Sequence, residues 1–180
     1  MNIANNHIYD YLERGFKDTL EALDSAGISY SGEGYTAYFD IKGLTIASLG
    51  YRGFSGSIKE QVGIDIKKAR DNADIVIVSF HWGQERSNYP NAIQLELGRY
   101  AIDQGADLVA GHHPHVIQGI EKYKNRYIVY SLANFCFGGN RNPSDKDTFI
   151  FQSAFTFKGK ELISVKGKVI PCQVSSVKEI

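Results

Sequence analysis

Cysteine is scarce in this sequence, and its placement indicates neither a disulfide nor a zinc site. Cys136 and Cys172 form no C-x-x-C pair, and both lie in apolar stretches typical of strands. Single cysteines in such stretches are usually buried thiols, so we expect both to be buried and unbonded. The cysteine content therefore does not indicate a cellular compartment.

Net charge and long apolar runs are also absent. The 20 basic and 20 acidic residues give a formal net charge of zero, whereas nucleic-acid-binding domains usually carry a basic excess. We therefore expect no nucleic-acid partner. No stretch approaches the ~20 apolar residues of a membrane helix, and the first residues lack the basic and apolar regions of a signal peptide. The sequence alone leaves the localisation unknown.

The length and composition are those of an ordinary globular domain. The chain has 180 residues, of which 43% are hydrophobic and 22% are charged. Chains of roughly 100–200 residues usually form one domain with its own core. We therefore expect residues 1–180 to form a single domain.

Helical periodicity and apolar runs alternate over most of the chain. Leu12, Phe16, Leu20 and Leu23 lie on one face of a helix that Gly27 would end. The continuous apolar run at 74–80 is typical of a strand buried on both faces. The pattern predicts helices over 10–27, 58–72 and 92–104, and strands over 35–41, 44–49, 74–80, 108–110 and 127–132.

The pattern changes after Asp147 to strands alone. Residues 148–157, 162–165 and 168–174 are typical of strands, and Gly159 and Gly167 separate them. An alternating front and a β-meander tail indicate an α/β fold with a mixed sheet or two packed sheets.

All five histidines lie at the ends of predicted elements. His7 precedes the first helix, His81 follows the strand that ends at Phe80, and the other three, His112, His113 and His115, follow the strand that ends at Ala110. Ligand sites of α/β sheets form beyond the carboxyl ends of the strands. Imidazole is a common ligand of zinc, iron, nickel and copper. A single histidine is usually a core or surface residue, but this grouping favours a metal or phosphate site.

The segment His113-Pro114-His115 suggests how two imidazoles converge. Residues two apart in an extended chain point to the same side. Pro114 has a fixed φ and favours extended geometry at His113. We therefore expect an extended backbone that directs both rings at one ion.

Other polar residues near these histidines have two interpretations each. Asn6 is either a metal ligand or a helix cap, and Asp10 is the expected N-cap of the first helix. Glu85 and Arg86 either face the site or are solvated, and Asn134 either orients a ligand or closes a turn. We assign His112, Glu85 and Asn134 as candidate substrate-binding residues.

Four motifs together resemble a known family. They occur in a familiar order and spacing at Ala4–His7 with Asp10, Phe80–Gly83, Gly111–Val116 and Tyr130–Phe135. This pattern is similar to the CapA family of poly-γ-glutamate capsule biosynthesis proteins and covers nearly all of residues 4–140. The resemblance implies a fold similar to calcineurin-like metallophosphatases, with mixed sheets in a sandwich flanked by helices.

The resemblance also implies roles for the motif residues. Asn6, His81, His113 and His115 match metal ligands, His7 matches the catalytic histidine, and His112 is an alternative ligand. The implied chemistry is metal-dependent hydrolysis with one or two ions of zinc, manganese or iron, in which His7 protonates the leaving group.

The sequence departs from the family pattern at its start. Family members have strands and a Gly-Asp carboxylate before the Asn-Asn-His motif, and many are held at the cell surface by an N-terminal segment. This chain begins at the motif. We therefore expect a fold without those first strands, a weaker or absent metal site, and an exposed sheet edge that favours a homo-oligomer.

Three functions are consistent with these features. The first is a metal-dependent hydrolase of a phosphoester or a γ-glutamyl amide. The alternative is a non-catalytic assembly module that binds an anionic polymer or other capsule-synthesis proteins. The third is an inactive remnant without metal.

Overall fold

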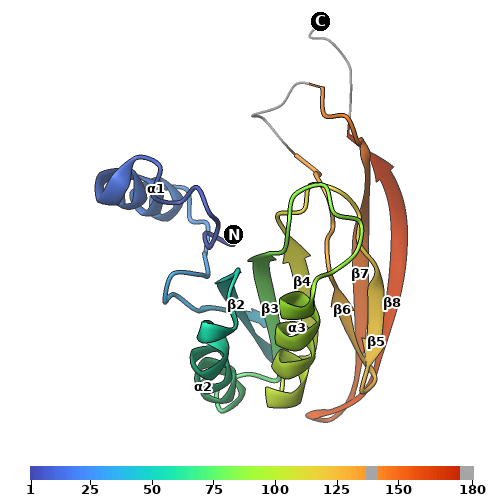
Figure 1. Ribbon diagram of the computed structural model, residues 1–180. Helices are drawn as coiled ribbons and strands as arrows, with labels where there is room; N and C mark the ends of the chain where they lie inside the picture. Colours follow the sequence, from blue (N-terminus) through green and yellow to red (C-terminus); the bar gives the residue numbers. More distant parts are fainter. Residues whose placement is uncertain (137–141, 175–180) are drawn as a thin grey trace, which may run out of the picture.

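The protein contains a six-stranded mixed sheet and a separate two-stranded sheet (Figure 1). A computed structural model describes residues 1–136 and 142–174. The large sheet has the order β1-β2-β3-β4-β6-β5, and β7 pairs with β8 in the small one. The elements are α1 (Leu12–Ser25), β1 (Ala37–Ile41), β2 (Leu44–Gly53), η1 (Gly56–Ile58), α2 (Lys59–Arg70), β3 (Ile75–Trp82), α3 (Ala92–Gln104), β4 (Leu108–His112), β5 (Ile120–Tyr123), β6 (Arg126–Val129), β7 (Asp147–Lys158) and β8 (Glu161–Gln173).

The four inner strands of the large sheet are parallel, and both edge strands are antiparallel to their neighbours. β2, β3, β4 and β6 run in one direction, whereas β1 and β5 are hairpin partners of β2 and β6. Parallel strands need both faces covered, which explains the continuous apolar run of β3. The expectation of an α/β fold with a mixed sheet is confirmed.

The main core lies between this sheet and helices α2 and α3. Both helices cover the same face of the sheet (Figure 1), and their buried residues include Val62, Ile66 and Leu97. On β3, Phe80 and Trp82 are fully buried, and their stacked rings have centroids 4.6 Å apart. The indole Nε1 of Trp82 donates to the carbonyl oxygen of Tyr130 at 2.8 Å, so the core ties β3 to the end of β6.

The β7–β8 hairpin packs against the other face of the sheet, near β5 and β6 (Figure 1). The Phe151 ring of β7 lies 5.4 Å from the Tyr127 ring of β6. Helix α1 lies apart from both sheets (Figure 1), and its Phe16 and Leu23 form a small second core with Ile3. The backbone N–H of Ile3 also donates to the Ser31 carbonyl oxygen at 2.9 Å, which ties the N-terminal residues to the segment before β1.

Asp107 connects the amino ends of three strands. Its carboxylate accepts from the Val76 backbone N–H at 2.9 Å, from Arg126 Nε at 3.0 Å and from Arg70 Nη2. The Asp107 side chain is only 4% exposed, so this ion-pair group is part of the interior. It lies at the end of the sheet opposite to the histidines.

The tail and one edge strand differ from the sequence predictions. The tail is a hairpin and not a meander, because β8 continues through Gly167, which the Phe151 ring covers closely. Strand β5 was not expected, since its four residues are mostly polar and half-exposed. The turn expected at Lys124-Asn125 joins β5 to β6, and both of its residues have positive φ, as a tight hairpin requires.

Two local expectations are also corrected. Asp10 does not cap α1: the N-cap position is Tyr11, which makes no side-chain capping bond. Cys136 is exposed rather than buried, because it lies in a bend beyond the last β6 residue, and Cys172 is half-buried. Both cysteines are unbonded, as expected.

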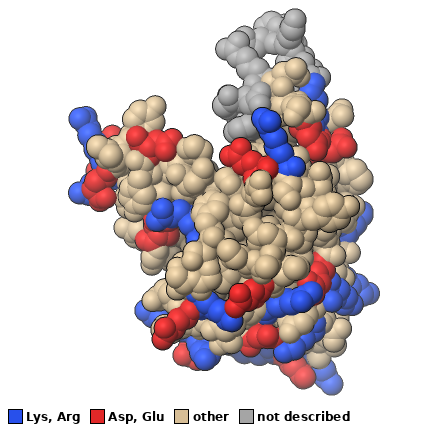
Figure 2. Space-filling model, in the orientation of Figure 1, with Lys and Arg blue, Asp and Glu red and all other residues tan. Residues whose placement is uncertain are grey.

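Surface charges of both signs are mixed on one face of the molecule. On the face shown in Figure 2, lysine, arginine, aspartate and glutamate lie side by side over the described residues, without a stripe of one sign. In the described part of the chain, no helix is long and apolar enough to span a membrane.

Candidate metal centre

The carboxyl ends of β3 and β4 bring the histidines together. His81 and His112 are register partners at these two strand ends, and His113 and His115 follow in the next loop. The rings of His81 and His113 are 4.7 Å apart. The segment before α1 adds Asn6 and His7 to the same region, so residues distant in sequence form one polar centre.

A carboxylate and two imidazoles form a group with the spacing of metal ligands. One ligand atom from each of Glu85, His113 and His115 lies within 4.8 Å of the other two. His113 Nδ1 is buried and has no hydrogen-bond partner within the described ranges. A buried polar atom without a partner is costly, and a bound cation would satisfy it. These residues therefore fit a divalent transition metal.

The backbone of this group differs from the expected extended form. His113 has φ of 96° and His115 has φ of 60°, both in the left-handed region. The bias that Pro114 exerts on His113 is therefore overridden by tertiary contacts, including a 2.8 Å hydrogen bond from the Arg86 N–H to the Pro114 carbonyl. Non-glycine residues adopt this region at a cost of about 1–3 kcal/mol, and such residues concentrate at functional sites.

Asn134 orients His115. The Nδ1 atom of His115 donates to Asn134 Oδ1 at 2.6 Å, and Asn134 Nδ2 donates to the His115 carbonyl at 3.2 Å. This pair selects the tautomer with the lone pair on Nε2, as the hydrogen-bond partners of ligating histidines commonly do. Asn134, assigned as a candidate substrate-binding residue, thus holds the His115 ring, and it also lines the small cavity described below.

A second chain of hydrogen bonds runs through the N-terminal motif. His81 Nε2 donates to Asn6 Oδ1 at 2.8 Å, and Asn6 Nδ2 donates to His7 Nε2 at 3.2 Å. Asn6 and His81, both predicted as metal ligands, thus bond to each other, and His81 is not one of the three grouped residues. His7 Nδ1 in turn donates to the Asp10 carboxylate at 2.8 Å. Asp10 is therefore the partner of His7, a role that the i, i+3 spacing in the sequence could have indicated.

Burial keeps three of the histidines neutral near pH 7. Burial, together with the neighbouring His113, lowers the pKa of His81 from its usual 6.5 to about 3. Burial also lowers the pKa of His112, and it lowers that of His113 despite the opposing effect of the Glu85 carboxylate. Neutral imidazole is the form that binds metals, so the environment favours coordination.

A small cavity opens beside the metal-ligand group. It measures about 270 Å³, and its walls include His7, Glu85, His115 and Asn134. His112 is not among its lining residues and lies at the strand end beside His81. The cavity therefore brings the predicted catalytic histidine and two of the three grouped ligands, Glu85 and His115, to one space.

Two buried glutamines hold the loop that carries Glu85. Gln118 Nε2 donates to the carbonyl oxygens of Ser87 and Tyr89 at 2.8 and 3.1 Å, and Gln118 Oε1 accepts from Gln94 at 2.8 Å. Gln94 also forms a capping box with Asn91 at the start of α3. No sequence signal indicated this role of Gln118, because a glutamine in a loop is usually solvated.

We expect Gln118→Leu to lower the free energy of unfolding by about 2–3 kcal/mol, because Gln94 and two carbonyl groups lose a buried partner. Loosening of the Glu85 loop should also weaken zinc binding. Urea denaturation and a zinc titration measure the two effects. Gln152→Leu, on the exposed face of β7, is the matched control. Equal losses in the two variants would contradict the role of Gln118.

A carboxylate and histidines at the carboxyl end of a parallel sheet define an α/β protein with a candidate metal centre. Sequence comparison assigns the chain to a family. The chain belongs to the family described as "Bacterial capsule synthesis protein PGA_cap", which matches residues 1–139. The motif residues all lie within this range.

Two relatives carry related names. The chain is 37% identical over 190 aligned positions to "Capsule biosynthesis protein CapA" of Bacillus anthracis, covering 92% of this chain and 46% of the relative. It is 40% identical over 159 positions to "PGA biosynthesis protein CapA" of Bacillus subtilis (strain 168), covering 76% and 42%. The chain thus spans less than half the length of these relatives.

A solved structure shares the fold. The crystal structure of a hypothetical protein from Thermus thermophilus superposes with a TM-score of 0.58 over 93% of this chain and 74% of that chain. The sequence identity is 14%, so the likeness concerns the fold alone.

Proposed function

We propose that this chain acts in the biosynthesis of a poly-γ-glutamate capsule, as a metal-dependent hydrolase of a phosphoester or a γ-glutamyl amide. The observation that carries this proposal is the group of Glu85, His113 and His115, whose ligand atoms lie within 4.8 Å of one another. Zinc, manganese and iron are all compatible with one carboxylate and two imidazoles. The names of the two CapA relatives support the biological process.

The roles of the protein side chains follow from their hydrogen bonds. Asn134 and the Gln118 loop would hold His115 and Glu85 in place for the ion. His7 lines the same cavity and is paired with Asp10, which would stabilise the ring when Nε2 takes up a proton. His7 would then deliver that proton to the leaving group. A bound ion would supply Lewis-acid activation of water and of the substrate.

The expected partners are an anionic polymer or a small-molecule substrate, and other capsule-synthesis proteins. A second copy of the chain is a further expected partner. β1 and β5 are the edge strands of the large sheet, and another copy could pair with one of them.

Metal content and turnover together test this function. The untagged protein, dialysed and then analysed by elemental mass spectrometry, should contain zinc, manganese or iron. The metal-loaded protein should hydrolyse bis-p-nitrophenyl phosphate or γ-glutamyl-p-nitroanilide, and His7→Ala should lower that rate by about 10²–10⁴-fold without loss of metal. Absence of metal after soaking would refute the proposal. Metal without turnover of either substrate would favour the non-catalytic assembly module.

A further inference from the structure

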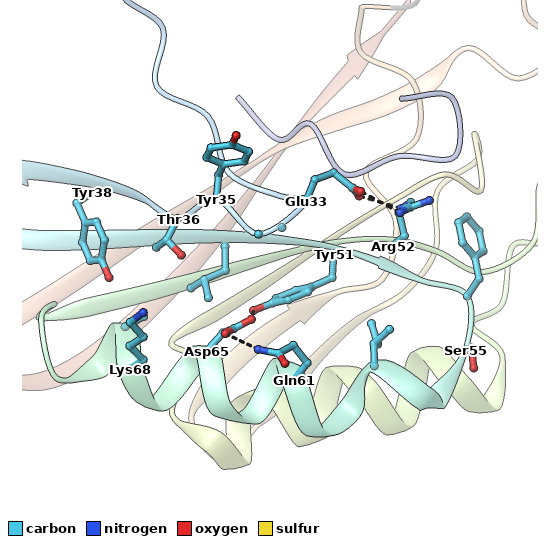
Figure 3. Close-up of a pocket in the computed structure, with 16 residues that line it drawn as sticks. Glu33, Tyr35, Thr36, Tyr38, Tyr51, Arg52, Ser55, Gln61, Asp65 and Lys68 are labelled. Atoms are coloured by element: carbon cyan, nitrogen blue, oxygen red, sulfur yellow. Dashed lines mark hydrogen bonds and ion pairs between the residues drawn. The ribbon is translucent and has the colours of Figure 1, made fainter. Parts of the chain in front are cut away.

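A second and larger cavity lies on the helix-covered side of the sheet. It measures about 810 Å³, within the range of about 300–1,000 Å³ typical of ligand pockets. β2 forms its floor, α2 forms one wall, and the segment from Glu33 to Tyr38 forms the other (Figure 3). Lys68 and Tyr38 lie toward one end in this view, and Arg52 and Ser55 lie toward the other.

The end near Arg52 adjoins the candidate metal centre. Phe54 lines the cavity, and its ring lies 4.9 Å from the His113 ring and 5.8 Å from the His81 ring. Arg52 is the register partner of His81 on the neighbouring strand. A ligand that extends along the cavity from Lys68 would therefore reach the histidines with one end.

Both carboxylates of the cavity already have partners. Arg52 binds Glu33 through two hydrogen bonds of 2.8 and 2.9 Å. Asp65 accepts from the Tyr51 hydroxyl at 3.0 Å and from Gln61 Nε2 at 2.8 Å. Lys68, by contrast, has no acidic partner among residues 1–136 and 142–174. The charge that remains for a ligand is thus the Lys68 ammonium group.

Exposed aromatic rings also line the cavity. Tyr35 and Tyr38 are each 44% exposed, and Phe54 is 40% exposed. Aromatic rings in a pocket pack against methylene groups, and tyrosine hydroxyls bond to polar groups at the ring edge. The lining therefore suits a ligand that has apolar segments between polar groups.

We propose that this cavity binds a segment of an acidic polyamide, a chain that combines carboxylates, amide groups and methylene segments. One ligand carboxylate pairs with Lys68, the methylene groups pack against Tyr38 and Phe54, and ligand amide N–H groups donate to Asp65 and Glu33. A γ-linked glutamyl chain has this composition. Polyphosphate does not, because it has neither amide N–H donors for the two carboxylates nor methylene groups for the aromatic rings.

This assignment rests on the proposed function for the substrate class, but the binding step requires no metal. Binding is therefore measured with EDTA present, by fluorescence anisotropy of a fluorescein-labelled γ-linked glutamyl oligomer. Loss of metal or of turnover leaves this result unchanged, so the two proposals fail separately.

Lys68→Glu should weaken oligomer binding by about tenfold or more, since it removes a charged hydrogen bond and adds repulsion. Tyr38→Ala should also weaken binding through lost ring contact. Lys67→Glu is the matched control, because Lys67 has the same charge on the same helix, is exposed and does not line the cavity. The Lys67→Glu variant should bind the oligomer with the same affinity as the wild type.

Three results would overturn the assignment. They are no binding of the oligomer to the wild type, equal weakening by Lys67→Glu and Lys68→Glu, and displacement of the oligomer by polyphosphate as effectively as by the unlabelled oligomer. The first result would show that the cavity does not bind this ligand, and either of the other two would show that the attraction is a general charge effect rather than binding in this cavity.

Discussion

Replacing His113 by alanine is expected to abolish stoichiometric metal binding. His113 supplies one of the three ligand atoms of the candidate centre, and its buried Nδ1 has no hydrogen-bond partner in the part of the chain that the structure describes. Loss of an outer partner of a ligand typically weakens metal affinity by about 10–100-fold, and loss of a direct ligand should weaken it at least as much. Elemental mass spectrometry after dialysis measures the effect.

His7→Ala is the control for this substitution. His7 lines the small cavity together with Glu85 and His115 but is not one of the three grouped ligands, so His7→Ala should retain the metal and lose turnover. Far-ultraviolet circular dichroism checks that both variants are folded. If folded His113→Ala retained as much metal as the wild type, the ion would be bound elsewhere.

The second large effect concerns stability and lies far from the metal centre. Asp107→Ala should lower the free energy of unfolding by about 3 kcal/mol, because it leaves the Arg70 and Arg126 guanidinium groups without their shared buried carboxylate. It also removes the acceptor of the Val76 N–H. Urea denaturation at neutral pH measures the change.

Asp103→Ala is the matched comparison. Asp103 pairs with Lys124 at 2.6 Å, but these side chains are 35% and 63% exposed. Exposed ion pairs contribute about 1 kcal/mol or less, so this variant should be nearly as stable as the wild type. Similar losses for Asp103 and Asp107 would show that the buried carboxylate does not hold the strands together.

Strands β3 and β5 differ in how far local sequence predicts them. The apolar run of β3 predicted a buried strand because parallel strands need apolar residues on both faces. β5 has no such run, and it exists because the Lys124-Asn125 turn pairs it with β6. Gly167 was interpreted as a break between strands, whereas in the fold it makes room for the Phe151 ring.

The sequence by itself determined the alternation of elements and the placement of the histidines at strand ends, because both depend on local periodicity and chain order. Only the tertiary structure decided which groups meet. Glu85 joins His113 and His115 through a loop held by Gln118, and Asp10 pairs with His7 instead of capping α1. These contacts depend on loop backbone angles, such as the positive φ of His113, which long-range hydrogen bonds impose against local preference.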